Sequence, residues 1–217
     1  MIDKTSKEFA KYLVDEDIAT FGEFLLKSGR KSPYFFNFGK LNNTKRLQIV
    51  CSFYAQKIIQ LGIDFDVIFG PAYKGIPLSI GVANAVQDLT HTPVEFCFNR
   101  KSVKKYGDVG SHVGANLEGK RVLITDDVVT SGITISESVK LVEKLGGEVV
   151  GFIVALDRQE KGVDIGISAA QFCENNYSFP LISVSSVSDI IEVLKTDSMN
   201  NAIVDSMNSY LRKYGAE

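Results

Sequence analysis

The chain of 217 residues has few cysteines, little net charge and no long apolar run. Its three cysteines, Cys51, Cys97 and Cys173, include no CxxC pair, and no His/Cys cluster indicates zinc. Because their number is odd and their surroundings are apolar, we expect free, mostly buried thiols in a reducing compartment. The formal net charge is −2, so the chain lacks the excess of basic residues that is typical of general nucleic-acid binding.

Two further absences concern membranes and secretion. No stretch approaches the roughly 20 apolar residues that span a bilayer. The first residues are charged and lack the long apolar core of a signal peptide. We therefore expect a cytoplasmic protein that binds neither nucleic acid nor membrane.

The composition, 45% hydrophobic and 23% charged, is typical of a globular protein, and the length predicts one domain over residues 1–217. Short apolar segments predict strands at 67–69, 94–98, 122–124, 149–156 and 181–184. Apolar residues at helical spacing predict helices at 3–15, 44–61, 75–87, 135–145 and 164–175, followed by two C-terminal helical segments. This alternation predicts an α/β fold with a mostly parallel central sheet flanked by helices.

An aromatic segment, 21–38, does not fit this alternation. It is broken by Ser28-Gly29-Arg30 and predicts a hairpin. We expect it to belong to a hood, made of about residues 1–40 and the C-terminal segment, over the ligand-binding edge of the sheet.

The most informative run covers residues 122–134. An apolar strand is followed by Asp126 and Asp127, then by the turn Thr130-Ser131-Gly132, and Thr134 opens a helical pattern. In open α/β sheets ligands bind outside the carboxyl ends of the strands. A turn that leads into a helix presents N–H groups to a phosphate, and acids beside it suit hydroxyls or a hydrated divalent cation. The run predicts a ligand with a phosphate and a sugar diol, whereas an acidic pair alone would more often be a solvated turn.

Two cationic segments extend this prediction. The run 70–75 contains two glycines and Lys74, follows a predicted strand and precedes a helix, so it suits a second anion. Residues 100–105 place four cations at the start of a glycine-rich segment, 100–114, which we expect to be a mobile loop that closes over the ligand. The plainer alternatives are a tight turn with a solvated lysine and an exposed, charged hairpin.

The segment 26–37 and Arg158 suggest how a planar group is recognised. Paired aromatic residues beside a hairpin can form a flat slot, and Lys27 adds a cation, although such aromatics are more often core. Arg158 follows the strand 149–156 and could form a bidentate pair with a carboxylate. Its alternative partners are Asp157 and Glu160.

The run 122–134 resembles the ribose-phosphate signature of the type I phosphoribosyltransferases, which bind 5-phospho-α-D-ribose 1-diphosphate (PRPP). The run 70–75 resembles the family's diphosphate loop, in which a strained or cis peptide is common. Residues 26–37, 100–105 and Arg158 resemble more specifically the orotate phosphoribosyltransferases, and five motifs occur in order over about residues 20–160. The resemblance implies transfer of the phosphoribosyl group from PRPP to orotate, with Mg²⁺ bound mainly through PRPP and water near Asp126 and Asp127.

The resemblance also assigns individual residues. The implied catalytic residues are Lys104, Arg100, Lys101, Asp126 and Asp127. The implied PRPP contacts are Lys27, Tyr73, Lys74, Arg100, Lys101, Lys104, Tyr106, Asp126, Asp127, Val128, Val129, Thr130, Ser131, Gly132, Ile133 and Thr134. The implied orotate contacts are Phe35, Phe36, Thr130 and Arg158. The family often has a histidine where Tyr106 stands, so an imidazole contribution at that position is in doubt.

The resemblance further implies a homodimer in which the segment 100–114 reaches the partner's site. Three alternatives stay open on sequence grounds. A phosphoribosyltransferase for another nucleobase would share the run 122–134 but lack the segment 26–37 and Arg158. A non-catalytic PRPP-binding regulator would need a DNA-binding element, and a PRPP synthetase would be much longer.

Overall fold

The computed structural model describes residues 4–104, 110–129, 132–163 and 165–216, and for residues 102–104 and 110 it describes the backbone alone. Two sheets are present in these ranges: a two-stranded one and a six-stranded one with the order β5-β4-β3-β6-β7-β8. The strands of the larger sheet are β3 (Val67–Gly70), β4 (Glu95–Lys104), β5 (Gly110–Gly114), β6 (Arg121–Val128), β7 (Glu148–Asp157) and β8 (Leu181–Ser186). All neighbours are parallel except β4 and β5, so the predicted mostly parallel sheet is confirmed.

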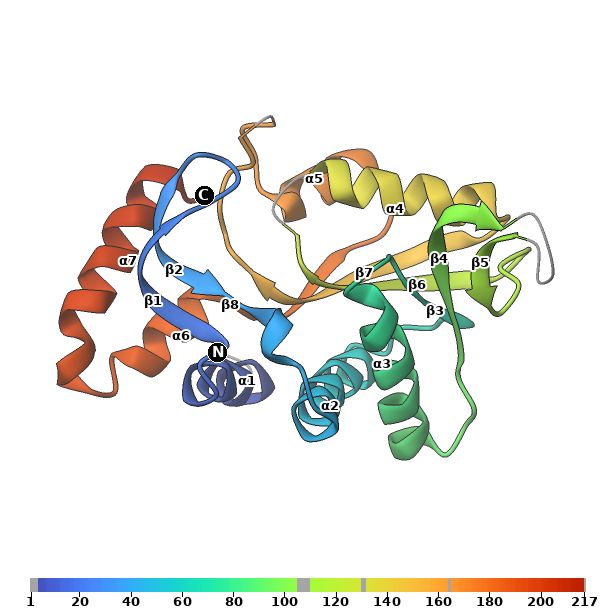
Figure 1. Ribbon diagram of the computed structural model, residues 1–217, viewed down its shortest axis with the longest axis horizontal. Helices are drawn as coiled ribbons and strands as arrows, with labels where there is room; N and C mark the ends of the chain where they lie inside the picture. Colours follow the sequence, from blue (N-terminus) through green and yellow to red (C-terminus); the bar gives the residue numbers. More distant parts are fainter. Residues whose placement is uncertain (1–3, 105–109, 130–131, 164, 217) are drawn as a thin grey trace.

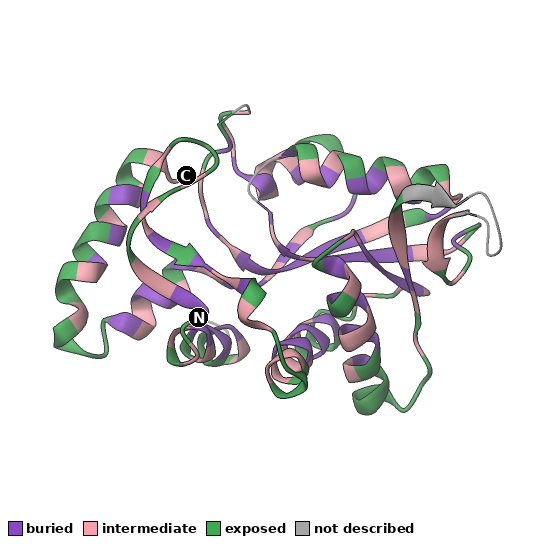
Figure 2. Ribbon diagram, in the orientation of Figure 1, coloured by how far each residue is buried: buried purple, intermediate pink, exposed green. Residues whose placement is uncertain are grey.

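The two middle strands of the sheet are β3 and β6, and the apolar runs of β3, β6 and the neighbouring β7 are buried (Figure 2). Helices cover the two faces of the sheet (Figure 1). On one face lie α1 (Lys4–Asp15), α2 (Thr44–Gln60) and α3 (Gly75–Thr90), and on the other lie α4 (Gly132–Lys144) and α5 (Ala169–Asn176). Each face has its own apolar core, which explains why the central strands read as continuous hydrophobic segments.

The helix predicted at 164–175 is shorter than expected. It begins only at Ala169, because Ser168 is its N-cap: the Ser168 hydroxyl accepts from the Gln171 N–H, and the Gln171 side chain accepts from the Ser168 N–H. This reciprocal capping box satisfies two N–H groups at the helix start and separates the helix from the preceding turns.

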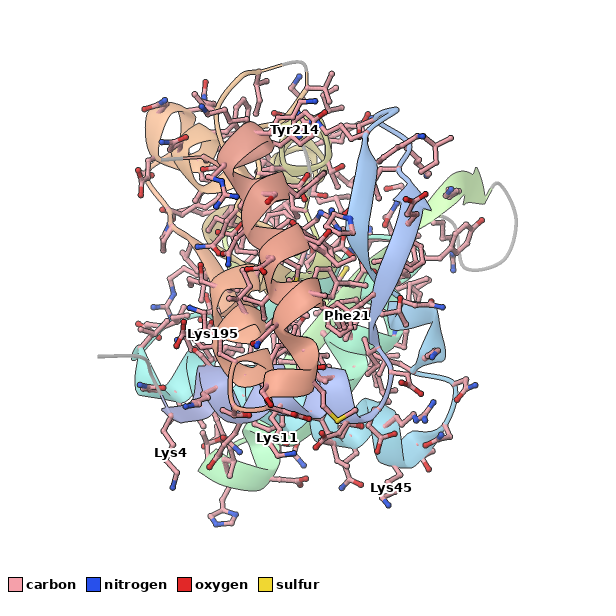
Figure 3. All side chains as sticks on the ribbon, turned by 90° about the vertical axis from the view of Figure 1, so that its left-hand side faces the viewer. Lys4, Lys11, Phe21, Lys45, Lys195 and Tyr214 are labelled. Atoms are coloured by element: carbon pink, nitrogen blue, oxygen red, sulfur yellow. The ribbon has the colours of Figure 1, made fainter. Side chains whose placement is uncertain are left out.

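The predicted hairpin is the second sheet, formed by β1 (Ala19–Leu25) and β2 (Lys31–Phe36). After β8 the chain continues as α6 (Val187–Leu194), a 3₁₀ turn (Ser198–Asn200) and α7 (Asn201–Tyr214). The last helix runs beside the hairpin, with Tyr214 near the hairpin turn (Figure 3), and the Tyr34 and Tyr210 rings meet edge to face at 5.5 Å. The hairpin and the C-terminal helix thus form a hood, whereas α1 packs against β8 and α6.

The segment 100–114 differs from the expected loop. Arg100–Lys104 continues β4 and Gly110–Gly114 is β5, with an irregular register between Asn99 and Lys104. The flanks of this segment therefore form an antiparallel hairpin, which was the alternative to a loop that closes over the ligand. The mobility of the segment stays a prediction. Residues 105–109 lie outside the described ranges.

Within the described ranges, none of the helices has the length and apolarity needed to cross a membrane.

Candidate active site

The acidic pair lies near the carboxyl end of the central strand β6. The Asp127 side chain is largely buried, and the Asp127 N–H donates to the Asp126 carboxylate at 2.9 Å. Beneath the pair, the buried Tyr54 of α2 donates its hydroxyl to the Asp126 carbonyl at 2.7 Å. Burial, and then the neighbouring charge of Asp127, raises the pKa of Asp126 to about 7. One carboxyl group of the pair therefore titrates close to neutral pH.

The turn after β3 is closely packed. A Cβ atom on Gly70 would lie 1.9 Å from the Gly75 carbonyl oxygen, and the Gly75 N–H donates to the Pro71 carbonyl at 3.0 Å. The Ala72 N–H donates to the Asn99 side chain of β4 at 2.7 Å, and the peptide between Ala72 and Tyr73 is cis. The neighbouring strand thus holds this turn against the sheet edge.

The two predicted anion and diol subsites face each other. Lys74 Nζ lies 2.5 Å from Asp127 Oδ2, although the two residues follow different strands. The lysine side chain is 58% exposed, whereas the aspartate side chain is 11% exposed. A bound phosphate ester of a sugar could therefore place its phosphate on the cation and its hydroxyls on the acids.

The cations of β4 lie beside this turn. Lys101 Nζ is 4.6 Å from the centre of the Tyr73 ring, and Tyr73 is 67% exposed. Arg100 precedes Lys101 on the same strand. Lys104 ends β4, but its side chain lies outside the described part of the structure, as does the whole of Tyr106.

The predicted phosphate cradle lies between β6 and α4. Val128 ends β6, Val129 is buried and Gly132 begins α4, while Ile133 is exposed and Thr134 half-buried. Thr130 and Ser131 lie outside the described residues. A Cβ atom on Gly132 would lie 2.7 Å from the Phe172 ring, so α5 packs closely against the start of α4. The first N–H groups of such a helix have no partner within the helix and are available to an anion.

Two of the residues predicted to bind a planar group, Phe36 and Arg158, meet beside the β1–β2 hairpin. Arg158 follows β7 and is 6% exposed, and its guanidinium lies 4.9 Å from the Tyr34 ring centre and 5.7 Å from that of Phe36. It pairs with Glu160 at 2.6 Å, which is one of the alternative partners considered above. Its Nε is buried without a hydrogen-bond partner among the described residues. The guanidinium therefore keeps donor capacity that the protein does not use.

The other predicted contacts on the hairpin are more exposed. Phe35 is 40% exposed, and its carbonyl accepts from the Thr20 hydroxyl at 3.0 Å. Lys27 lies in the exposed turn between β1 and β2. The structure brings Phe36 and Arg158 together but does not place the Lys27 side chain against either.

Several residues around the site were not singled out from the sequence. Tyr54 and Asn99 hold the acidic pair and the turn after β3, and Tyr210 reaches the segment after β7 from the C-terminal helix. No local pattern marks them, because each acts through a contact between distant parts of the chain. Glu160 was identified only as a possible partner of Arg158, yet it accepts from four side chains.

The carboxylates of the acidic pair suit a cation whose other ligands are water molecules and substrate phosphates. The described residues contain no group of three or more His, Cys, Asp or Glu side chains that could hold a metal ion. Two adjacent carboxylates, one of them paired with Lys74, fit Mg²⁺, which keeps several waters and takes one or two carboxylates together with substrate phosphates.

The buried cysteines are consistent with the sequence analysis. Cys51, Cys97 and Cys173 are buried and free, and burial raises the pKa of each thiol to about 12. These thiols are therefore unreactive at neutral pH.

A mostly parallel sheet with an acidic pair, a closely packed turn that carries a lysine and a helix start along one carboxyl edge has the arrangement of a phosphoribosyltransferase. A family model described as the phosphoribosyl transferase domain matches residues 38–183. The curated orotate phosphoribosyltransferase of Vibrio atlanticus is 42% identical over 209 residues, which cover 96% of this chain and 97% of that protein. That of Stutzerimonas stutzeri is 43% identical over 210 residues, with coverage of 96% and 97%.

A solved structure agrees with these relatives. The crystal structure of orotate phosphoribosyltransferase from Francisella tularensis has a TM-score of 0.86 and 34% sequence identity, and covers 96% of this chain and 100% of that chain. The chain therefore belongs to the orotate phosphoribosyltransferase family.

Proposed function

We propose that this protein transfers the 5-phosphoribosyl group from PRPP to orotate, forming orotidine 5′-monophosphate and diphosphate in the synthesis of UMP. The observation that carries the choice of orotate is Arg158, a buried guanidinium with an unused donor that lies over the Tyr34 and Phe36 rings. A planar base with a carboxylate would complete its hydrogen bonds and balance its charge. A neutral purine or uracil has no carboxylate to offer to that unused donor.

The PRPP molecule would lie along the carboxyl edge of the sheet. Asp126 and Asp127 would accept from the two ribose hydroxyls, and the N–H groups of residues 129–134 would hold the 5-phosphate. The diphosphate would contact Tyr73, Lys74 and the cations of the segment 100–104. The contact between Lys74 and Asp127 supports this placement, because it shows that the two side chains are close enough to bind one PRPP molecule. Lys74 would bind the diphosphate of PRPP, and Asp127 would bind its diol.

The chemistry would begin with cleavage of the bond between C1 of the ribose and the diphosphate, ahead of attack by the orotate ring nitrogen. The positive charge that develops on the sugar and the negative charge on the leaving diphosphate both need stabilisation. In this proposal the carboxylates would lie beside the first, and Lys74 and the β4 cations beside the second. Positioning of the two substrates and exclusion of water would supply the rest.

Mg²⁺ is part of this proposal. Asp126 and Asp127 would hold its water shell, and the ion would neutralise charge on the diphosphate when bound. The pairing of two carboxylates without a third ligating side chain among the described residues supports a cation held mainly by the substrate.

We also propose a cytoplasmic homodimer in which the segment 100–114 serves the partner's site. Free, buried cysteines support a reducing compartment. The exposed Tyr73 and Lys101 at the edge of the site support closure by further residues.

The first test follows the loss of orotate absorbance after PRPP and Mg²⁺ are added to the purified protein, with uracil, hypoxanthine and adenine assayed in parallel. Turnover of orotate alone is expected. Turnover of another base instead would refute the substrate, and PRPP binding without turnover of any base would favour a non-catalytic regulator.

A further inference from the structure

The carboxylate of Glu160 joins three separate parts of the chain under the hood. Its Oε1 accepts from Arg158 Nη2 at 2.6 Å and from the Tyr34 hydroxyl at 2.9 Å. Its Oε2 accepts from the Tyr210 hydroxyl at 3.0 Å and from Arg30 Nη1 at 3.5 Å. The side chain is only 10% exposed. One carboxylate therefore links the β1–β2 hairpin, the segment after β7 and the C-terminal helix.

The two phenols that contact Glu160 both have a raised pKa. Burial, and then the charge of Glu160, raises the pKa of Tyr34 far above its ordinary value and that of Tyr210 to about 12. Both phenols therefore stay protonated and donate to Glu160 at any working pH. With its four lone-pair sites engaged in this way, the carboxylate has little freedom to rotate.

The charges of the cluster do not cancel. Two guanidinium groups, those of Arg30 and Arg158, share the single carboxylate of Glu160. Arg30 also donates to the Lys161 carbonyl at 2.8 Å and lies over the Tyr214 ring, so its position is fixed by other contacts. Among the described residues, the side chain of Arg158 donates only to Glu160, and its Nε has no hydrogen-bond partner. The excess positive charge is thus on Arg158, the residue that the proposed function assigns to the carboxylate of the base.

We propose that Glu160 is the positioning residue of the base site: it holds the Arg158 guanidinium over the Tyr34 and Phe36 rings so that the remaining N–H groups of Arg158 bind the orotate carboxylate. This inference rests on the proposed function. Tyr34 and Tyr210 fix Glu160 in turn, so the hood determines the orientation of an arginine that follows the central sheet. Without Glu160, Arg158 can adopt other rotamers and the enzyme must order it when orotate binds.

The test compares steady-state kinetics of Glu160→Gln with those of the wild type. Glutamine keeps the shape of the side chain but cannot form the ion pair. We expect the KM for orotate to rise about tenfold or more, while kcat and the KM for PRPP change by less than about threefold. Glu192→Gln, which makes the same chemical change in an exposed pair with Lys195 on α6, is the matched control and should leave all three parameters unchanged.

A double variant separates positioning from a merely structural role. If Glu160 acts through Arg158, then Arg158→Gln/Glu160→Gln should have an orotate KM no higher than that of Arg158→Gln alone. Independent, multiplying effects would overturn the inference, and so would a lowered melting temperature with an unchanged orotate KM.

Two outcomes distinguish this inference from the proposed function. If Arg158→Gln raises the orotate KM and Glu160→Gln does not, the positioning role fails and the function stands. If the wild type does not use orotate, both fail. Should Glu160→Gln not fold, Tyr34→Phe and Tyr210→Phe each remove one donor to Glu160 and should raise the orotate KM by about two- to fivefold, and no change in either would refute the role.

Discussion

Asp126 and Asp127 are adjacent in the sequence but differ in their surroundings. Asp127 contacts Lys74, whereas burial and the neighbouring carboxylate raise the pKa of Asp126 to about 7 from 3.8. The folded protein therefore binds a proton at Asp126 more tightly than the unfolded chain. The stability that this proton contributes is fully present below about pH 4 and is lost as the pH rises through about 7.

We expect Asp126→Asn to remove this pH dependence. Relative to the wild type, the variant should gain stability as the pH rises from about 4 to about 7, by at most about 1.4 kcal/mol per pH unit, and the difference should then level off. Chemical denaturation at a series of pH values measures it. In the wild type, PRPP affinity should increase with pH over the same range, because the proposed role of the carboxylate is to accept from the ribose hydroxyls. A parallel increase in the variant would contradict the assignment.

The side chain of Lys74 is in direct contact with Asp127 of the acidic pair. We expect Lys74→Gln to raise the KM for PRPP by about tenfold to a hundredfold, because a charge-assisted hydrogen bond to the diphosphate is worth about 1.5–3 kcal/mol. The KM for orotate should stay nearly constant. Lys140→Gln on the exposed side of α4 is a control of the same type, and an equal loss in both variants would argue against a diphosphate site at Lys74.

Among the secondary-structure elements, the turn between β3 and α3 depends most directly on glycine. A Cβ atom on Gly70 would overlap the Gly75 carbonyl, a backbone atom that cannot move without displacing the start of α3. We expect Gly70→Ala to destabilise the protein by about 1–3 kcal/mol and to weaken PRPP binding. Gly151→Ala in β7 is the control, because its nearest neighbour is a methyl group of Leu123 at 3.0 Å. Thermal unfolding and PRPP titration of both variants test this, and an equal loss in both would refute the explanation.

Most elements could be predicted from hydrophobic periodicity, because β6, β7 and the helices over them bury apolar residues at regular spacing. The predictions were wrong where local hydrogen bonds or strand pairing determine the bounds of an element. Ser168 starts α5 later than its apolar pattern suggests, since its capping bonds satisfy the first N–H groups there. The cationic segment after Asn99 continues as a strand because β5 pairs with it, although its composition resembles a loop.

At the scale of the whole molecule, the proposed homodimer makes a quantitative prediction. If the segment 100–114 serves the partner's site, Lys104→Ala and Asp127→Asn each inactivate a different half of one composite site. Mixing the two inactive variants under conditions that exchange subunits should restore about a quarter of wild-type activity, because half of the dimers then contain one intact site. Sedimentation of the mixture checks that dimers form. A mixture that stays inactive although subunits exchange would show that each site is complete within one chain.

The sequence by itself determined the order of most strands and helices, the acidic pair before a turn that leads into a helix, and the cations at 74 and 100–101. These features depend on local periodicity and on motifs whose residues are neighbours in the chain. Only the tertiary structure decided which of them meet: Lys74 contacts Asp127, Asn99 holds the turn after β3, and the hood places Glu160 against Arg158. Such contacts join residues that are far apart in sequence, and they form because the apolar faces of the sheet, the helices and the hood must all be buried at once.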